Sequence, residues 1–293
     1  MISLVQLGTV DYATGLRLQQ QLVALRKEEK IGDVLLLLEH KPVITLGRNA
    51  KAANVVASSE LLNKRDVELF ECDRGGDVTF HGPGQIVGYP IFDLRGFPTP
   101  DGRRKTLGVI EFVRRLEDVL MRTCADFAIP TKRVSGLTGV WTETEGEDRH
   151  PGTSNAQVGT AAPGRPVEQS STENLTTSTH AEAKLAAIGV HISRFITSHG
   201  FALNVNTDLS YFDLIIPCGI TSKPVTSMQQ QLACELDVNN VAESISRNFG
   251  VVFGSQILWV DTLDALLGRT VGVPMKPPAE LRHLHKEDDT TWA

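Results

Sequence analysis

The apolar positions of the first fifty residues predict two strands and an amphipathic helix. Asp11 can cap a helix whose apolar side chains, between Leu16 and Leu25, lie mainly on one side. The run VLLLLEH at 34–40 is apolar without alternation, which is typical of a strand covered on both faces. VITLG at 43–47 follows as a second strand candidate. These patterns indicate a central sheet on which helices pack.

Helices and strands continue to the middle of the chain. The mixed segment 51–66 is expected to be helical around SSELLNKR at 58–65. VELFECD at 67–73 predicts a strand that runs into a glycine-rich segment. After Thr106, a candidate N-cap, the spacing predicts a helix with one buried stripe and one charged, solvated face. The stripe holds Val109, Ile110, Val113, Leu116 and Leu120, and the charged face holds Arg114, Arg115, Glu117 and Asp118. VSGLTGVWTE at 134–143 predicts a further strand.

Two more strands are predicted beyond residue 180. The segments 181–192 and 195–206 have strand patterns, with a turn expected at Gly200 between them, and Lys184 opens the first. The apolar run that follows stops before a Pro-Cys-Gly turn, which places Cys218 at the end of a strand-like segment.

Composition divides the chain into one domain and two polar segments. Residues 144–179 are rich in Gly, Pro, Ser, Thr, Glu, Asn and Gln with almost no large apolar side chain, so they predict a disordered insertion. A helix that ends at Gly250 and a short helix at 261–268 precede a charged tail. We therefore expect a single domain over residues 1–272 and a mobile tail over 273–293.

The composition favours a globular protein that acts on a small molecule or another protein. The chain has 293 residues, 41% of them hydrophobic, which is enough to bury a core. Its net charge of -6 argues against a general electrostatic grip on nucleic acid or an anionic membrane. No apolar stretch approaches the roughly 20 residues that cross a bilayer. The first residues show no targeting pattern.

The cysteines predict neither a disulfide framework nor a zinc site, because they lack CxxC spacing. They are Cys72, Cys124, Cys218 and Cys234. Cys124 and Cys234 are expected to be small buried hydrophobes. His283 and His285 in the tail have no carboxylate or thiol at ligand spacing, so solvated side chains are expected there rather than a metal site.

The segment RGGDVTFHGPGQIVGYP at 74–90 predicts a binding loop. Its glycines permit positive φ and a close approach of backbone to a ligand, although glycine clusters also make ordinary turns. His81 and His199 are each followed by glycine and are expected on two loops that can converge. The charged residues here are Asp73, Arg74 and Asp77. They could form a local ion pair that has no role in catalysis.

Cys218 and Lys184 are the candidate reacting groups. A thiol between proline and glycine is held by rigid backbone yet need not be buried, and a nearby cation favours the thiolate, which is the nucleophilic form. Lys184 opens an otherwise apolar strand, an unusual place for a solvated lysine. Most cysteines are structural and most strand-start lysines lie at the surface, so the sequence alone does not bring the two together.

Three segments occur in one order along the chain: RGGDVTFHGPGQIVGYPIFDL, KLAAIGVHISRFITSHGFALNVNTDLSYFDLIIPCGI and VTS at 225–227. In this order they resemble the octanoyltransferases of lipoic acid synthesis, also called lipoate-protein ligase B. The resemblance runs from the first residues to about Phe253, excluding the polar insertion. It implies the α+β fold of biotin and lipoate ligases, a mixed sheet with packed helices and a smaller second sheet, as the catalytic domain. The long insertion indicates a eukaryotic, fungal version.

The resemblance also implies a role for each matched residue. Cys218 would carry the octanoyl group as a thioester, and Lys184 would favour the thiolate and handle protons. The substrate-binding residues would be Arg74, Gly75, Gly76, Asp77, Val78, Thr79, Phe80, His81, Ala187, Ile188, Gly189, Gly200, Phe201 and Ala202. Apolar walls are expected from Val78, Phe80 and Ile188; Phe80 stands where the family commonly has tyrosine. Backbone N–H groups near Gly219 or in the Gly75–Gly76 turn are expected to stabilise the oxyanion.

The implied donor is octanoyl-acyl carrier protein. The implied acceptor is a lysine on the lipoyl domains of 2-oxoacid dehydrogenase complexes or on the glycine cleavage H protein. One thioester exchanges for another before an amide forms, so neither ATP nor a metal is expected. Neither nucleic acid nor a membrane is an expected partner. A eukaryotic member would work in the mitochondrion, and otherwise the cytoplasm is expected.

Two other functions stay open at this point. The first is an ATP-dependent lipoate or biotin ligase, which shares the fold. A lysine in the place of Lys184 serves both the ligase and the transferase reaction, but the ligase needs no cysteine nucleophile. A non-catalytic lipoyl-domain or nucleotide-binding module would use the glycine-rich segment only to bind, with Cys218 as a packing residue.

Overall fold

The computed structural model describes residues 1–99, 106–143, 182–267 and 289–292. Within these residues, nine strands form one large sheet. They are β1 (Ile2–Val10), β2 (Asp33–His40), β6 (Gln85–Ile91), β7 (Thr131–Val134), β8 (Leu137–Thr142), β9 (Lys184–Ser193), β10 (Ile196–Asn204), β11 (Ile257–Trp259) and β12 (Asp289–Trp292). Their order is β11-β1-β2-β6-β10-β9-β8-β7, and β12 also pairs with β9. β1 runs parallel to β2 and β11, and the other pairs are antiparallel, so the sheet is mixed.

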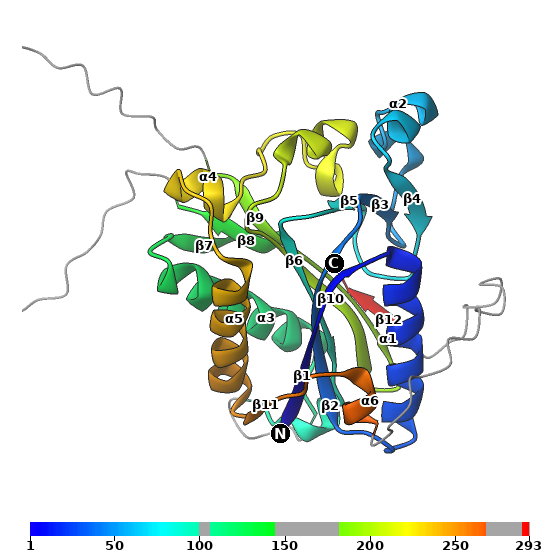
Figure 1. Cartoon of the computed structure of the whole chain (residues 1–293), viewed down its shortest axis with the longest axis vertical. Helices are drawn as coiled ribbons and strands as arrows, with labels where there is room; N and C mark the ends of the chain where they lie inside the picture. Colours follow the sequence, from blue (N-terminus) through cyan, green and yellow to red (C-terminus); the bar gives the residue numbers. More distant parts are fainter. Residues whose placement is uncertain (100–105, 144–181, 268–288, 293) are drawn as a thin grey trace, which may run out of the picture.

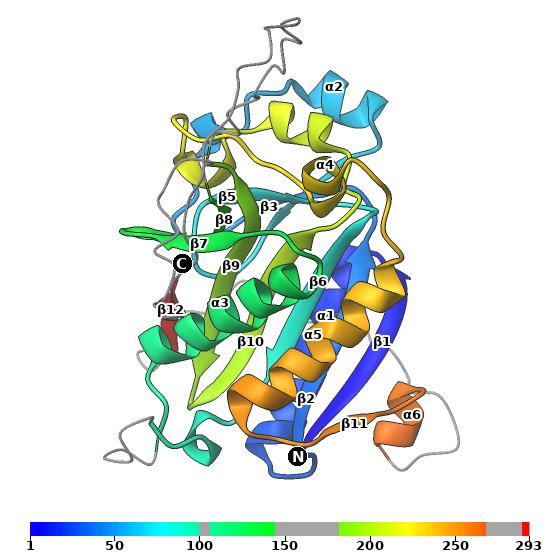
Figure 2. The same ribbon diagram turned by 90° about the vertical axis from the view of Figure 1, so that its left-hand side faces the viewer.

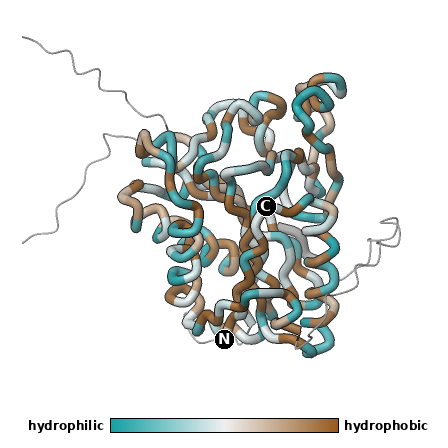
Figure 3. Tube along the Cα trace, in the orientation of Figure 1, coloured by the Kyte–Doolittle hydropathy of each residue, from teal (hydrophilic) through white to brown (hydrophobic). Residues whose placement is uncertain are grey.

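Helices cover both faces of this sheet, as Figures 1 and 2 show. α1 (Tyr12–Lys27) lies on one face, and α3 (Val109–Asp126) and α5 (Val238–Phe253) lie together on the other. The side chains of β2 alternate between two cores: Leu35 and Leu37 pack on the α3 and α5 side, and Leu36 packs on the α1 side. Hydrophobic residues concentrate along the central strands (Figure 3). The prediction that residues 34–40 form a strand covered on both faces is confirmed.

A second, three-stranded sheet lies beside the large one (Figure 1). It contains β3 (Val43–Leu46), β4 (Glu68–Glu71) and β5 (Val78–His81) in the order β4-β3-β5. Its apolar face packs with α2 (Ser59–Lys64) and η3 (Leu209–Leu214), through a core that includes Ile44, Leu62 and Phe212. The predicted α+β fold, a mixed sheet with packed helices and a smaller second sheet, is confirmed.

The remaining helices are short. They are η1 (Ala52–Asn54), η2 (Leu94–Gly96), η4 (Pro217–Gly219), α4 (Met228–Leu232) and α6 (Leu263–Leu266). The helix expected around residues 58–65 is α2, and η1 precedes it in the same mixed segment. In the part of the chain described above, no helix is both long and apolar enough to span a lipid bilayer.

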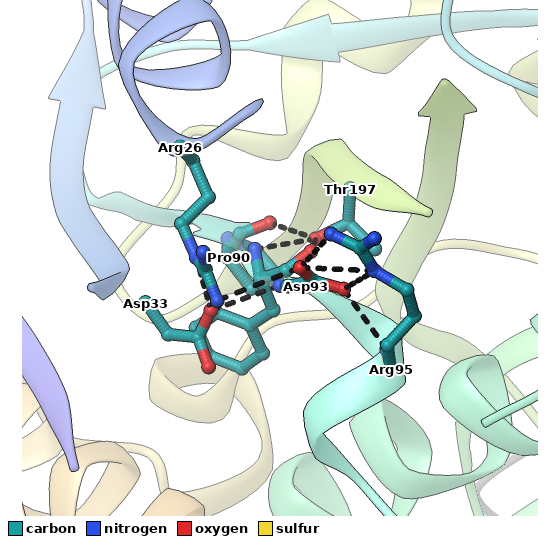
Figure 4. Close-up of polar contacts among 7 residues, drawn as sticks. Arg26, Asp33, Pro90, Asp93, Arg95 and Thr197 are labelled. Atoms are coloured by element: carbon teal, nitrogen blue, oxygen red, sulfur yellow. Dashed lines mark hydrogen bonds and ion pairs between the residues drawn. The ribbon is translucent and has the colours of Figure 1, made fainter. Parts of the chain in front are cut away.

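A polar cluster fixes the ends of α1, β2 and β6 to one another (Figure 4). Arg26 in the last turn of α1 donates to the Asp33 carboxylate at 2.9 Å, and the same oxygen accepts the backbone N–H of Asp93 at 2.9 Å. Thr197 on β10 donates its hydroxyl to the carbonyl of Pro90 at 2.6 Å. These bonds link neighbouring strands at the end of the large sheet and hold their register.

The turn between β9 and β10 is not at Gly200, where the sequence predicts it. It falls at Arg194 and Phe195, which both adopt positive φ, and Gly200 lies inside β10. The glycine serves another purpose there, because a Cβ at Gly200 would stand 2.1 Å from the carbonyl oxygen of Gly88 on β6. The close approach of two strands, rather than a turn, requires glycine at this position.

Two helix ends also differ from the sequence prediction. α3 has Gly108 at its N-cap instead of Thr106. α5 continues past Gly250 to Phe253 and ends at Gly254, which adopts the left-handed conformation that terminates helices. Because Phe253 packs in the main core, burial of this side chain favours one further turn of helix.

The predicted faces of α3 are correct in part. Ile110, expected in the apolar stripe, is 58% exposed, and Glu117, expected on the solvated face, is completely buried. Glu117 tolerates burial because arginines bind it, as described below. Cys124 is buried as predicted, and burial raises the pKa of its thiol to about 12. Cys234 is exposed, so the prediction that it is buried is wrong.

Several sequence predictions lie outside the described residues. They concern the insertion at 144–179 and the tail at 273–288, which includes His283 and His285. Within the predicted tail, Asp289–Trp292 are described; they form β12 and pair antiparallel with β9.

Candidate active site

A cavity of about 390 Å³ lies where the two sheets meet. Its walls come from β5 in the small sheet, from β6, β9 and β10 in the large sheet, from the turn at η4 and from the segments 74–77 and 136–138. The predicted site residues that line it are Arg74, Gly76, Asp77, Thr79, His81, Lys184, Ala187, Ile188, Gly189, Gly200, Phe201, Ala202 and Cys218. Its size is in the range of small-molecule sites.

Lys184 and Cys218 meet at this cavity. The ammonium of Lys184 donates a hydrogen bond to the Cys218 sulfur, with Nζ and Sγ 3.2 Å apart. Lys184 is 8% exposed, and Cys218 is partly buried. This contact places a cationic side chain against the sulfur of a candidate nucleophile. The fold therefore joins the two groups that the sequence left apart.

The turn that carries Cys218 is strained and firmly held. Cys218 has φ 55° and ψ 19°, a left-handed conformation that non-glycine residues rarely adopt. The turn is tied on one side by Ile216, whose N–H donates to the carbonyl of Asn54 at 2.7 Å. Gly219 also has positive φ, and a Cβ there would stand 2.9 Å from the carboxylate of Asp77. The Pro-Cys-Gly sequence thus fits a turn that presents the sulfur to the cavity.

Lys184 is fixed by its backbone and by an aromatic ring. It is the first residue of β9; its N–H donates to Pro224 O at 2.8 Å, and its carbonyl accepts the N–H of Thr226 at 2.9 Å. Thr226 belongs to the VTS motif, so this motif positions Lys184. The ammonium lies 5.3 Å from the centre of the Trp141 ring, which is close enough for a cation–π interaction.

Arg74 organises the loop that precedes β5. Its guanidinium is 8% exposed and donates to backbone carbonyls of Thr45, Gly75 and Asp77 at 2.7 to 2.9 Å, and also to the Thr45 hydroxyl. The Asp77 carboxylate accepts instead from the Asn54 side chain and from the backbone N–H of Val78. The ion pair considered among Asp73, Arg74 and Asp77 is therefore not formed. Arg74 fixes the loop through its carbonyls.

Asp73 binds two histidines behind the same loop. Its carboxylate accepts from His191 Nδ1 at 2.5 Å and from His199 Nε2 at 2.7 Å. Burial alone would raise the pKa of Asp73, but the hydrogen bonds and charges of these histidines hold it well below its usual range. The expectation that His81 and His199 lie on converging loops is correct in that both line the cavity, but both lie on strands.

The β5 strand separates the predicted substrate-binding residues into two groups. Side chains of a strand alternate, so Thr79 and His81 face the cavity while Val78 and Phe80 face the other way. Phe80 stacks on Tyr211 with ring centres 4.7 Å apart in the core of the second sheet. The expectation that Val78 and Phe80 form walls of the cavity is wrong. Gly75 is also absent from the lining.

The wall on β9 and β10 matches the expectation more closely. Ile188 lines the cavity together with Ala187, Phe201 and Ala202, which makes this side largely apolar. Gly189 is required by packing, since a Cβ there would stand 2.7 Å from the carbonyl oxygen of Gly75. In addition, the Gly75 N–H donates to the carbonyl of Val190 on β9 at 3.1 Å, so the loop before β5 lies directly on β9.

Burial disfavours the charged form of two histidines on one side of the cavity. Burial lowers the pKa of His81 to about 3, and that of the neighbouring His40 to about 4. His81 Nδ1 lies 2.7 Å from the Gln85 side-chain oxygen, and His40 Nε2 lies 2.6 Å from the Tyr89 hydroxyl. Tyr12 also lines the cavity here, so the side near His81 and Tyr12 carries little charge. It is suited to an apolar chain.

Two of the amides expected to stabilise the oxyanion donate hydrogen bonds within the protein. The Gly219 N–H donates to Ile216 O at 3.1 Å, and the Gly75 N–H donates to the carbonyl of residue 190. The first bond lies within the turn that carries Cys218, and the second joins the loop to β9, so these two amides are engaged within the protein in this structure.

Sequence reasoning missed several residues at the site. Trp141 touches the Lys184 ammonium, and Asn54 ties the Cys218 turn to Asp77. Neither has a local signal, since Trp141 belongs to an ordinary predicted strand and Asn54 to a mixed segment. The role of the 136–138 segment at the rim depends on strand pairing that no short motif reveals.

Comparison with known proteins agrees with the fold. The family model described as the lipoyl protein ligase A/B catalytic domain matches residues 11–250. An octanoyltransferase of Koribacter versatilis is 53% identical, with 98% of each chain covered. One of Acidobacterium capsulatum is 51% identical, with 91% of this chain and 96% of the relative covered.

Solved structures share the fold at low identity. A bi-partite lipoate protein ligase of Thermoplasma acidophilum, determined with its E2 lipoyl domain, has a TM-score of 0.60 at 12% identity and covers 92% of this chain and 90% of its own. Lipoate-protein ligase A bound with ATP has a TM-score of 0.56 at 12% identity, with 91% and 92% covered. These likenesses concern the fold alone.

The relatives named above are bacterial, so the expectation of a eukaryotic, fungal version is not supported, and with it the mitochondrial location loses its basis. The resemblance to octanoyltransferases stands on nearly the whole chain. The chain therefore belongs to the lipoyl protein ligase A/B catalytic domain family, as an acyltransferase of the octanoyltransferase group that acts in protein lipoylation.

Proposed function

We propose that the chain moves an octanoyl group from acyl carrier protein to a lysine of a lipoyl domain, through a thioester on Cys218. The observation that carries the proposal is the 3.2 Å contact between Lys184 Nζ and Cys218 Sγ at the edge of a partly apolar cavity. In this pairing the ammonium stabilises the attacking thiolate.

In the first step, the Cys218 thiolate attacks the carbonyl carbon of the octanoyl thioester. A carbon–sulfur bond forms to Cys218, the bond to the carrier sulfur breaks, and the departing thiolate takes a proton that Lys184 can supply. One thioester replaces another, so the step has little free-energy change and uses no ATP.

In the second step, the ε-amine of the acceptor lysine attacks the Cys218 thioester. The carbon–nitrogen bond forms as the carbon–sulfur bond breaks, and the attacking amine loses a proton to the neutral amine of Lys184. The product is an amide, which is more stable than the thioester. The octanoyl tail would lie along the β9 and β10 wall near Ile188 and Phe201, where each buried methylene contributes about 0.8 kcal/mol.

The test is intact-mass analysis after incubation with octanoyl-acyl carrier protein in the absence of ATP. We expect one octanoyl adduct on the unmodified chain and none on Cys218→Ser. Cys234→Ser is the control, because this thiol is exposed and away from the cavity, and it should keep the adduct. Transfer from the isolated adduct to a lipoyl domain tests the second step.

The rival reaction, an ATP-dependent ligation, gives a different result in the same assay. Modification of the lipoyl domain would then require octanoate and ATP, and Cys218→Ser would remain active. A chain without an adduct under any of these conditions would contradict the thioester mechanism.

A further inference from the structure

Glu117 is a buried carboxylate outside the lining of the cavity. It lies on α3, is completely buried, and uses both of its oxygens. Oε2 accepts from Arg114 at 2.7 Å and from Arg133 of β7 at 2.8 Å. Oε1 accepts the backbone N–H of Gly139 on β8 at 3.2 Å. A buried charge is retained only where such bonds compensate its lost hydration, and here one of them goes to a backbone group of a neighbouring strand.

The backbone that Glu117 holds is next to Lys184. β8 pairs with β9 with a register shift between Val140 and Trp141, which is a β-bulge or a similar irregularity. Gly139 precedes it with φ 125°, and a Cβ at this glycine would stand 2.9 Å from Cε of Lys184 and 2.5 Å from the carbonyl oxygen of Ala186. The backbone of Gly139 therefore packs against the aliphatic part of the Lys184 side chain.

The same strand supplies the ring under the ammonium. Trp141 lies two residues beyond Gly139, with its ring centre 5.3 Å from Lys184 Nζ. A shift of β8 at Gly139 would therefore move both contacts that restrict the lysine side chain, its stem and its charged end.

We propose that Glu117 is a positioning residue that directs Lys184 at Cys218 by fixing the irregular part of β8. It acts through Gly139 and Trp141 and touches neither substrate nor sulfur. This inference rests on the proposed function, in which the Lys184 ammonium activates the Cys218 thiolate.

The direct test is the rate at which iodoacetamide alkylates Cys218, followed by peptide mass analysis. Glu117→Gln keeps the shape of the side chain but turns an amide toward the arginines or toward Gly139. Because misplacement of a catalytic group by about 1 Å can cost up to roughly 100-fold, we expect alkylation at pH 7 to slow by about tenfold or more.

Asp118→Asn is the matched control. Asp118 is the next residue on α3 and also binds Arg133, but it is largely exposed and does not reach Gly139. This variant should alkylate within about twofold of the parent chain. Glu117→Asp covers the case in which Glu117→Gln fails to fold, because it keeps the charge for the arginines and shortens the reach to Gly139. It should also be slow.

A double-mutant cycle separates positioning from a general structural role. Glu117→Gln should slow alkylation in the parent chain but have no further effect in Lys184→Met, where no ammonium remains to be directed. If Lys184→Met alkylates like the parent, the proposed activation fails. If Lys184→Met is slow while Glu117→Gln and Glu117→Asp are as fast as the parent, the positioning role is excluded and the proposed function stands. If Glu117→Gln slows alkylation by the same factor in the parent chain and in Lys184→Met, the positioning role is also excluded.

Discussion

Replacement of Lys184 by methionine tests the centre of the site. Methionine keeps an unbranched chain of similar size and removes the charge that lies 3.2 Å from the Cys218 sulfur. At this separation the attraction of two unit charges is about 1.3 kcal/mol in bulk water and about 5 kcal/mol at an effective dielectric constant of 20. The pair is partly buried, so the true value lies between these limits.

The lower limit already predicts a measurable effect. Since 1.4 kcal/mol is a factor of ten in an equilibrium, Lys184→Met should reduce the thiolate fraction at pH 7 by about tenfold or more. The assay is the pseudo-first-order rate of Cys218 alkylation by iodoacetamide, resolved from the other thiols by peptide mass analysis. The thiolate is the reacting form, so the rate reports its population.

Lys223→Met is the matched control. Lys223 also lies beside the Trp141 ring, with 5.8 Å between its Nζ and the ring centre, and is paired with Glu182. Loss of its charge should leave the alkylation rate within about twofold of the parent, because no contact joins it to the sulfur. If Lys184→Met alkylates as fast as the parent chain at pH 7, the ammonium does not activate Cys218 and the reasoning is refuted.

Three further predictions concern the frame of the site. Arg74→Lys keeps the charge but loses the planar group that binds several carbonyls, so octanoyl transfer should fall at least about tenfold with the thermal midpoint lowered; unchanged kinetics would contradict the role given to this loop. Gly189→Ala places a methyl group 2.7 Å from the Gly75 carbonyl, so it should raise KM for octanoyl donors more than Ala187→Gly does. His40 and His81 have folded pKa values of about 4 and 3, below the unfolded value of about 6.5, so the unfolded chain binds more protons. As the pH falls through about 5, these two groups should therefore lower the free energy of unfolding by about 2.5 kcal/mol per pH unit, and His81→Gln should remove about half of that slope in urea titrations at pH 4.5 to 6. An unchanged slope would show that His81 is protonated in the folded state.

Much of the fold follows from local patterns. The unbroken apolar run at 34–40 predicts a strand with two covered faces, and β2 has its side chains in two cores. The first strand, β1, was not predicted. From Gln6 onward it is partly exposed and holds polar residues, and its pairing with β2 and β11 is set by contacts that are distant in sequence. Helix ends were predicted less well, since tertiary packing decides whether one more turn forms, as at Phe253.

Most residues that line the candidate site were predictable from the sequence, and its geometry was not. The position of Cys218 between proline and glycine indicated a constrained turn, and the structure has that turn in a left-handed conformation. The contact with Lys184 joins residues 34 apart in the chain, so only the assembled fold creates it. The burial of Glu117 was not predictable from α3 either, because its arginine on β7 and its backbone partner on β8 come from beyond the helix.

Hydrogen bonds join the end of β8 directly to the residue before β9. The N–H of Thr142 donates to Ala183 O at 2.9 Å, and the N–H of Ala183 donates to the Thr142 hydroxyl at 3.0 Å. Antiparallel strands whose ends are this close can be joined by a short reverse turn. The stretch between them is thus a natural place for engineering: a purification tag or a reporter domain could be inserted there, or the stretch replaced by Asn-Gly, while the neighbouring lysine stays where it is.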